Sequence, residues 1–314
     1  MALTLCWIVR LWKCGWCWKS LQLYGLVDAA VGRFAGPAAG INAQDRAVTK
    51  LDGGGMSTSH WGVRGTEDLG GGLSAQFELS SFVRNDSGAT GRSDALPTPV
   101  NVAADPVFSR AAWVGVSHRD WGRVRLGNVT SLLFLNSITS NAFGDSTVLG
   151  PLNLVTFIGS PLTGGTAWAN SVVYDSPNIA GFNASVAHAI SEGQGGGNSA
   201  ARLAYAQGPW AASLAWQSVK KNPGTFADGT SPNDTRAWQL AASYDFEVAK
   251  LFVHLGRIEN KGTEATPLDV SYKVWDLSAT VPVGAGNILA GYASRRTSDA
   301  VGPVPATAAG GNVQ

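Results

Sequence analysis

The chain has 314 residues, of which 45% are hydrophobic and only 14% are charged, against about 25% charged in ordinary soluble domains. Its 23 basic and 22 acidic residues nearly balance, which argues against a nucleic-acid-binding surface. No stretch carries the roughly 20 uninterrupted apolar residues that a membrane-spanning helix needs. Two classes remain, a soluble β-rich protein and a membrane β-barrel, and the mean hydropathy of +0.03 fits the alternating residues of the barrel.

The first residues form a segment unlike the rest of the chain. Cys6, Cys14 and Cys17 are the only cysteines, and two of them make a C-x-x-C that lacks the surroundings of a redox or zinc site. The apolar run is broken by Arg10, has no basic region before it and ends without an A-x-A-like cleavage site, so it is not a convincing signal peptide. We expect residues 1–19 to be an atypical leader outside the fold, and residues 20–314 to form one domain.

From residue 20 onward the hydrophobic pattern has the period of a β-strand. In LSAQFELSSF (73–82), for example, apolar residues alternate with Ser, Gln and Glu. Each such segment presents one apolar and one polar face. The pattern predicts about 13 strands, over residues 20–30, 57–65, 72–84, 108–118, 122–130, 167–175, 180–189, 198–207, 210–219, 235–245, 250–259, 269–281 and 286–296.

The connections between these strands alternate in length. Short ones are expected at 66–72, 118–122, 176–181, 207–210 and 245–250. Long ones are expected near 35–56, 86–106, 131–166, 191–197, 221–233 and 260–268. Short turns at one end and long loops at the other are typical of an antiparallel up-and-down barrel of the outer membrane.

A run of three glycines in HWGVRGTEDLGGGL (60–73) has two interpretations. A phosphate-binding loop would need a helix immediately after it, and a strand pattern follows instead. The run is therefore predicted to be a turn between two strands, on the periplasmic side of a barrel. The residues assigned to this turn are Glu67, Asp68, Gly70, Gly71 and Gly72.

Four motifs, in order, carry a family resemblance. LYGLVDAAV, WGVRGTEDLGGGL, SRAAWVGVSHRDWGRVRLGN and NSVVYDSPNIAGF resemble the general porins of Gram-negative bacteria, of the β-proteobacterial type, over residues 20–296. The resemblance implies an all-β transmembrane antiparallel up-and-down barrel of about 16 strands, of which about 13 are present here and about three at the C-terminus are missing. It also implies a long third loop, 131–166, folded into the pore.

The same resemblance implies the function. General porins are homotrimers in the outer membrane, surrounded by its lipid, through which small hydrophilic solutes and inorganic ions diffuse passively. No cofactor, metal, nucleic acid or enzymatic activity is implied.

The resemblance also locates a constriction at the tip of the third loop. The family's P-E-F-G-G element corresponds to NAFGD (141–145), in which Phe143 and Gly144 match and Asp145 supplies a carboxylate. Ala142 stands where relatives carry a glutamate. One acidic group of the loop is therefore absent.

On the wall opposite the loop, relatives carry arginines, and the opposed charges produce a field across the pore. His60, Asn128 and Ala169 stand at those positions here. With an ordinary pKa of about 6.5, a histidine is mostly neutral at pH 7. The resemblance therefore predicts a weak transverse field and weak charge selectivity.

Other charged residues are expected on the lumen wall. Arg64 and Glu78 match charged positions of the family, and Arg123 and Arg125 face the same side of their strand. Arg64 and Arg123 have a second interpretation, as solvated lumen residues without a role in selectivity.

Three alternatives to a working porin remain at this level. The chain could be a truncated porin fragment without pore activity. It could be an outer-membrane barrel enzyme, although its four histidines lie on different strands or strand ends (His60, His118, His188 and His254). It could also be a soluble β-sandwich binding protein.

Overall fold

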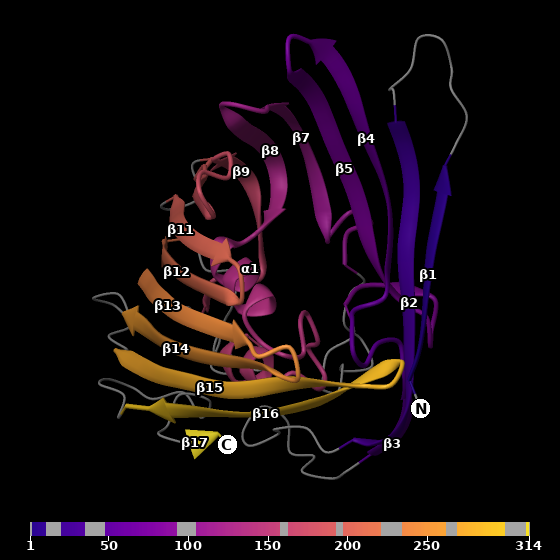
Figure 1. Ribbon diagram of the computed structural model, residues 1–314, viewed down its shortest axis with the longest axis vertical. Helices are drawn as coiled ribbons and strands as arrows, with labels where there is room; N and C mark the ends of the chain where they lie inside the picture. Colours follow the sequence, from indigo (N-terminus) through magenta and orange to yellow (C-terminus); the bar gives the residue numbers. More distant parts are fainter. Residues whose placement is uncertain are drawn as a thin grey trace.

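A computed structural model of the chain describes residues 2–10, 20–34, 48–92, 105–157, 163–192, 197–220, 234–261, 269–298 and 312–313. Its strands form one sheet that curls around a central space (Figure 1). The strands are β1 (Ala2–Arg10), β2 (Ser20–Phe34), β3 (Val48–Asp52), β4 (His60–Gly70), β5 (Leu73–Arg84), β6 (Ala89–Thr90), β7 (Ala111–His118), β8 (Gly122–Thr130), β9 (Ala167–Asp175), β10 (Phe182–Ala189), β11 (Asn198–Gln207), β12 (Trp210–Val219), β13 (Asp234–Asp245), β14 (Lys250–Lys261), β15 (Val270–Val283), β16 (Gly286–Thr297) and β17 (Asn312–Val313). The helices are α1 (Leu132–Thr139) and α2 (Pro151–Thr156).

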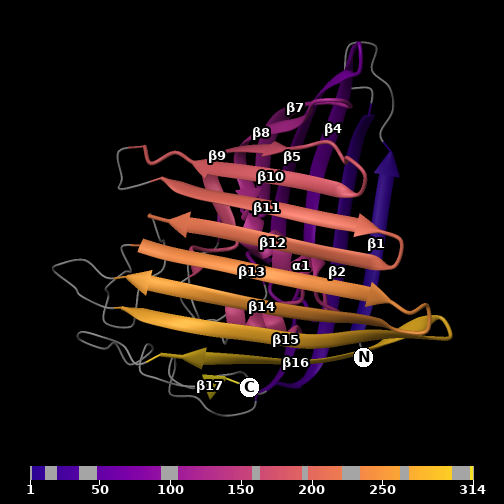
Figure 2. The same cartoon turned by 60° about the vertical axis from the view of Figure 1, so that its left-hand side comes forward.

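Each long strand pairs antiparallel with the next long strand along the chain. The ladder runs β2, β4, β5, β7, β8, β9 and then in order to β16, while β3 pairs with β2 and β6 pairs with β5. Figure 2 shows the β10 to β16 wall as a regular series of antiparallel arrows. The predicted up-and-down antiparallel fold is confirmed, and each predicted strand corresponds to one of the long strands.

The strands β1, β3, β6 and β17 were not predicted. The backbone of β1 pairs with β2, from Ala2 opposite Ala30 to Arg10 opposite Gln22. This pairing supplies partners for the N–H and C=O groups at the edge of β2, which would otherwise be unpaired. The domain boundary at residue 20, with residues 1–19 outside the fold, stays a prediction from the sequence.

The period-two pattern has the expected structural meaning. On β13, Trp238 and Leu240 are exposed on the outer surface, while Ala237, Gln239 and Ala241 point inward and are buried. Large apolar side chains recur on the outer surface of strands throughout the sheet, as lipid contact requires. Among the described residues, no helix is long and apolar enough to span a membrane.

The glycine run forms a turn, but a shorter one than predicted. Strand β4 continues to Gly70, so Glu67 and Asp68 lie in the strand opposite Ala75 and Ser74 rather than in the turn. The pairing is interrupted by an irregularity between Asp68 and Gly70. The three glycines, Gly70, Gly71 and Gly72, have φ angles of 86°, 61° and 87°, a region that glycine adopts without the strain of a Cβ atom. The chain therefore reverses its direction at these three glycines.

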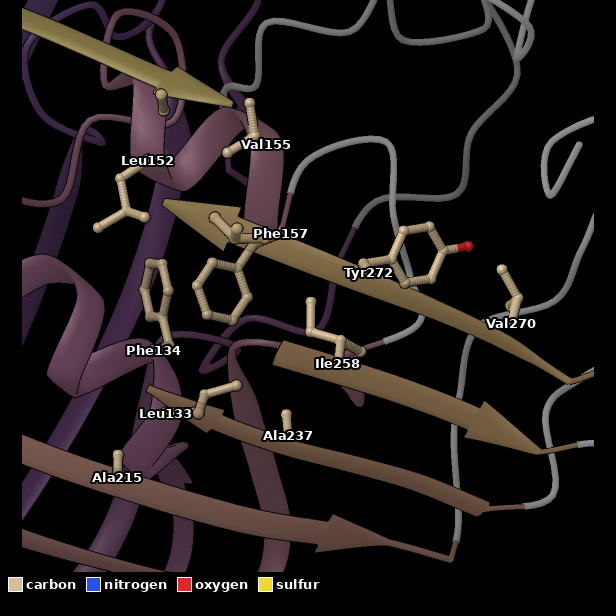
Figure 3. Close-up of a cluster of buried hydrophobic side chains, with 12 residues drawn as sticks. Leu133, Phe134, Leu152, Val155, Phe157, Ala215, Ala237, Ile258, Val270 and Tyr272 are labelled. Carbon is tan, nitrogen blue, oxygen red and sulfur yellow. The ribbon is translucent and has the colours of Figure 1, made fainter. Parts of the chain in front are cut away.

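Within the segment 131–166, residues 131–157 contain both helices and lie against the inner face of the sheet (Figure 1). The Ser131 side chain caps α1 by accepting a hydrogen bond from the Phe134 backbone N–H at 3.3 Å. The apolar side chains of both helices pack on inward-facing residues of β12 to β16 (Figure 3). This core consists of Leu133, Phe134, Leu152, Val155, Phe157, Ala215, Ala237, Ile258, Val270, Tyr272, Val274 and Ala293. The long third loop is therefore folded inside the sheet, as the sequence predicts, and we call 131–166 the inner loop.

Candidate functional site

The tip of the inner loop is a tight turn that includes Phe143, Gly144 and Asp145. The Asn141 side chain closes it, with Nδ2 donating to the Gly144 carbonyl oxygen at 3.0 Å and Oδ1 accepting from the Phe143 N–H at 2.7 Å. Gly144 has a φ of 56°. The Phe143 ring covers Gly291 of β16, where an added Cβ would lie 2.7 Å from a ring carbon. The tip is therefore rigid and rests on β16.

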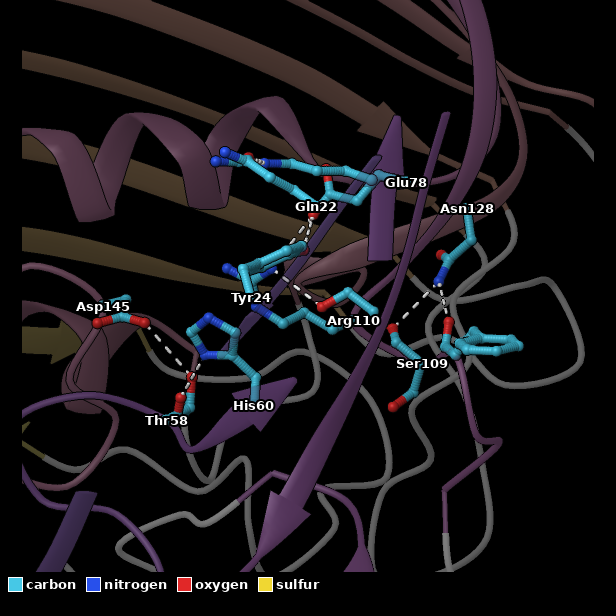
Figure 4. Close-up of polar contacts among 12 residues, drawn as sticks. Gln22, Tyr24, Thr58, His60, Glu78, Ser109, Arg110, Asn128 and Asp145 are labelled. Carbon is cyan, nitrogen blue, oxygen red and sulfur yellow. Dashed lines mark hydrogen bonds and ion pairs between the residues drawn. The ribbon is translucent and has the colours of Figure 1, made fainter. Parts of the chain in front are cut away.

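The tip also reaches the opposite side of the sheet, at the segment that leads into β4. Asp145 accepts hydrogen bonds from the Ser57 hydroxyl at 2.8 Å and the Thr58 hydroxyl at 3.3 Å (Figure 4). The Ser146 hydroxyl donates to the Gly55 carbonyl oxygen at 2.7 Å. The loop thus crosses the interior, and two hydroxyl groups donate hydrogen bonds to the Asp145 carboxylate.

Asp28 on β2 holds this receiving segment in place. Its fully buried carboxylate accepts from the backbone N–H groups of Gly55, Met56 and Ser57, at 3.1, 3.0 and 2.9 Å. Successive N–H groups converging on one carboxylate form a strong anion-binding concavity. We call Asp28 with residues 55–57 the Asp28 clasp. The sequence places Asp28 on the polar face of its strand but does not reveal this role.

On the wall beside the tip, four side chains form a polar group that we call the wall cluster: Tyr24, His60, Glu78 and Arg110 (Figure 4). The His60 Nδ1 atom lies 2.8 Å from the Thr58 carbonyl oxygen, and its ring meets the Tyr24 ring edge-on at 6.0 Å. The Tyr24 hydroxyl donates to Glu78, whose Oε1 atom is 3.4 Å from Arg110 Nη1. The structure thus brings His60 and Glu78 together on the wall.

Arg110 was not predicted as a site residue; it falls within the predicted strand 108–118 but directly precedes β7 in the structure. Its Nη1 atom also donates to the Ser80 hydroxyl at 3.2 Å. Arg64 lies next to the wall cluster and is exposed, with its guanidinium 4.9 Å from the Tyr24 ring centroid and Nε donating to Gln22 at 2.8 Å. The wall therefore carries two arginines near the tip, and Arg110 is paired with a carboxylate.

Arg123 and Arg125 lie together, but apart from the loop tip. Both bind Asp175 at the end of β9, with their Nη2 atoms each 3.0 Å from Asp175 Oδ2. Asp175 was not predicted as a site residue, because it is 50 residues beyond Arg125 along the chain. These arginines make a second charged group near the end of the sheet that carries the short turns.

Asn128 is not brought together with the wall cluster, and this corrects its predicted place at the constriction. Its Nδ2 atom donates to the backbone carbonyl oxygen atoms of Ser109 at 3.0 Å and Phe108 at 3.4 Å (Figure 4). The pairing of β8 with β9 shifts between Gly127 and Val129. The prediction was made from the family resemblance, whereas the strand places Asn128 on the face opposite to that of Arg123 and Arg125.

The described residues contain no group of three His, Cys, Asp or Glu side chains that could hold a metal ion. The site consists of the loop tip on one side and the wall cluster on the other. Its chemistry is that of opposed polar and charged groups lining a passage, which can sort solutes by size and charge.

Comparisons with known proteins agree with this geometry. Residues 13–314 match the profile of a family described as Gram-negative porin. The chain is 33% identical over 287 residues to outer membrane porin protein 32 of Delftia acidovorans, covering 88% of this chain and 74% of that protein. It is 26% identical over 261 residues to an outer membrane porin protein of Bordetella pertussis, covering 76% of this chain and 64% of the relative, just under two thirds of its length.

Solved structures give the same picture. An anion-selective porin from Comamonas acidovorans superposes with a TM-score of 0.70 at 28% identity, covering 88% of this chain and 79% of that one. An outer membrane protein of Vibrio cholerae, solved in a trimer form, shares the fold with a TM-score of 0.63 at 15% identity, covering 93% and 80%.

Proposed function

Because the chain belongs to the Gram-negative porin family, we propose that it forms a water-filled channel for passive diffusion of small hydrophilic solutes and inorganic ions, with weak charge selectivity. The relatives are outer-membrane proteins, and porins are channels rather than enzymes. The predicted outer-membrane location and the prediction that the chain is not an enzyme are both confirmed.

The observation that supports a channel is the inner loop, which crosses the interior and leaves a polar wall facing its tip. The tip of the loop is joined to this wall by hydrogen bonds of Asp145 and Ser146 at residues 55–58. Gln22, Arg64 and Glu78 line a hollow on this wall. Polar side chains around an interior space are what a water-filled passage requires.

Two features of the wall support weak selectivity. Arg110 is paired with Glu78 at 3.4 Å, whereas the hydroxyl groups that bind Asp145 are neutral and leave its charge in place. His60, at a position where the resemblance places an arginine, donates from Nδ1 to the Thr58 carbonyl oxygen at 2.8 Å. One wall arginine is thus paired and a histidine replaces another, which supports a weak transverse field.

We also propose that the protein is a homotrimer surrounded by outer-membrane lipid. The trimer form of the Vibrio cholerae neighbour and the apolar outer surface of the sheet support this proposal.

Planar bilayer recording of the purified protein tests the channel and its selectivity. We expect stepwise, ohmic conductance in KCl and a reversal potential near zero in a KCl gradient. Absence of conductance would favour the alternative of a fragment without pore activity. Strong anion selectivity at neutral pH that His60→Ala abolishes would contradict the weak field.

A further inference from the structure

Two arginines near the short-turn end of the lumen are held in a fixed orientation. Asp175 accepts from Arg123 Nε and Nη2 at 3.2 and 3.0 Å, and from Arg125 Nε and Nη2 at 3.0 and 3.3 Å. The Ser185 hydroxyl also donates to Asp175, at 2.8 Å. Both guanidinium groups lie 5.6 Å from the Trp113 ring centroid. One carboxylate, fully engaged, therefore orients two cations.

A third arginine faces the same space from β11. Arg202 donates from Nε to Asn136 Oδ1 at 3.1 Å and from Nη2 to the Thr139 hydroxyl at 3.2 Å, both on α1. Its partners are neutral, so its charge is not cancelled by them. Arg123, Arg125 and Arg202 line one hollow of about 520 Å³ together with Asp175. Its polar lining also includes Gln76, Ser117, His118, Asn183 and Ser185.

The charges in this hollow do not balance. Three guanidinium groups face one carboxylate, and Arg119, which also lines the hollow, pairs with Asp120 at 3.4 Å. Within the described residues, no protein acceptor bonds the Nη1 atoms of Arg123, Arg125 or Arg202. Guanidinium N–H groups in a fixed fork match the oxygen atoms of phosphate and carboxylate groups.

We propose that Arg123, Arg125 and Arg202 form a binding subsite for polyvalent oxyanions, solutes that carry phosphate or carboxylate groups. The subsite lies between α1 and the short turns, next to the hollow that Arg123 shares with Glu78 and Arg64, and it rests on the proposed channel function. A solute that has passed the loop tip meets these arginines before it leaves the lumen. The subsite raises the local concentration of such anions without a strong field at the constriction.

Planar bilayer recording in KCl at neutral pH tests the subsite, with inorganic phosphate or citrate added as the probe. An anion that occupies the hollow reduces the chloride current, so we expect a saturable decrease with a defined half-effect concentration. Arg123→Gln is expected to raise that concentration about fivefold, the effect of one partly solvated charge pair. It leaves Arg125 on Asp175 and touches neither helix.

Two further variants separate charge from structure. Arg202→Gln is expected to raise the half-effect concentration similarly, and Arg202→Lys to restore it in part, because lysine keeps the charge. Arg64→Gln is the matched control: it removes a lumen arginine whose side-chain hydrogen bond is also to a neutral partner, Gln22. It is expected to change the half-effect concentration less than twofold, a few tenths of a kcal/mol.

Three results would overturn the subsite. One is a current that falls without saturation for both probes. Another is an Arg64→Gln effect as large as that of Arg123→Gln, since the cause would then be the general potential of the lumen. The third is unchanged block in both Arg123→Gln and Arg202→Gln. Failure of the channel function itself is distinct, because the unmodified protein would then conduct no current in KCl alone. The difference between the phosphate and citrate arms identifies the preferred oxyanion.

Discussion

Two groups of strands in the sheet have similar outer surfaces but differ in the side chains of their inner surfaces. On strands β12 to β16, the inner face packs against the inner loop through apolar side chains such as Ala237, Ile258 and Val274. On strands β2 to β8, the inner face carries charged and polar groups such as Glu78, Arg123 and Arg125. We call these the covered wall and the open wall. Most of the loop's apolar side chains pack on the covered wall, while its tip is hydrogen-bonded to the open wall.

This difference shows how a constriction is built from one chain. Burial of apolar area fixes the base of the loop, because removing such area from water is the largest favourable term available. At the tip, hydrogen bonds to residues 55–58 fix its position against the open wall. The passage is therefore bounded by a stable core on one side and a directional polar contact on the other.

The largest expected effect comes from weakening the core of the covered wall. Leu152 is fully buried between α2 and the sheet. Leu152→Ala should lower the free energy of unfolding by about 2–5 kcal/mol, the usual effect of a large cavity. Urea denaturation in lipid vesicles measures it. Leu149→Ala, on the same loop but 43% exposed, is the control and should have little effect. Equal effects would mean that the loop is not anchored by this core.

The outer surfaces should respond alike on both walls. Leu240 on β13 and Val114 on β7 are exposed there, near the middle of their strands. Leu240→Arg and Val114→Arg should each lower the free energy of unfolding by about 2–4 kcal/mol, because each places a charge against lipid. The same denaturation assay compares the two variants. A penalty on one wall only would show that the contrast between the walls extends to the outer surface.

Loosening the Asp28 clasp should release the tip while the core stays intact. Asp28→Asn replaces an acceptor of three backbone N–H groups with an amide that matches them poorly. The free energy of unfolding is expected to fall by about 1–3 kcal/mol, and the single-channel current is expected to fluctuate more. Asp68→Asn, which alters the acceptor of the Gly70 N–H at the exposed end of β4, should leave the fluctuations unchanged. If the Asp28→Asn current fluctuates no more than that of the unmodified protein, the Asp28 clasp does not hold the tip in place.

The smallest effect is expected on selectivity at the wall cluster. His60→Arg adds a permanent charge beside the loop tip, so it should shift the reversal potential in a KCl gradient toward that of chloride. His60→Ala should leave it nearly unchanged at neutral pH, because an ordinary histidine is mostly uncharged there. If His60→Ala shifts the potential away from that of chloride while His60→Arg leaves it unchanged, His60 already carries a positive charge in the unmodified protein.

The strands of both walls could be predicted because alternation is a local property of the sequence. Strand β13, for example, shows the expected alternation of exposed and buried side chains along its length. The turn at Gly70 to Gly72 was less well predicted, since Glu67 and Asp68 have no pattern that separates strand from turn. The helices α1 and α2 were not predicted either, because both are short and depend on the wall they cover.

The site was predicted less completely than the fold. Asp28, Arg110 and Asp175 act through partners 27 or more residues away, and no spacing in one sequence reveals such pairs. Asn128 was placed at the constriction by the family resemblance alone, and its side chain instead bonds the Ser109 and Phe108 carbonyl oxygen atoms. His60 and Asp145 were found through the family resemblance, and the structure adds that hydroxyl groups bind Asp145.

The pairing of each long strand with the next one along the chain has a consequence for folding. Such contacts are close in sequence, so the ladder can grow one hairpin at a time with little loss of loop entropy. The contact of Asp145 with Ser57 joins residues 88 apart, and it needs both walls in place before it can form. The width of the passage is therefore decided last, after the sheet that surrounds it has formed.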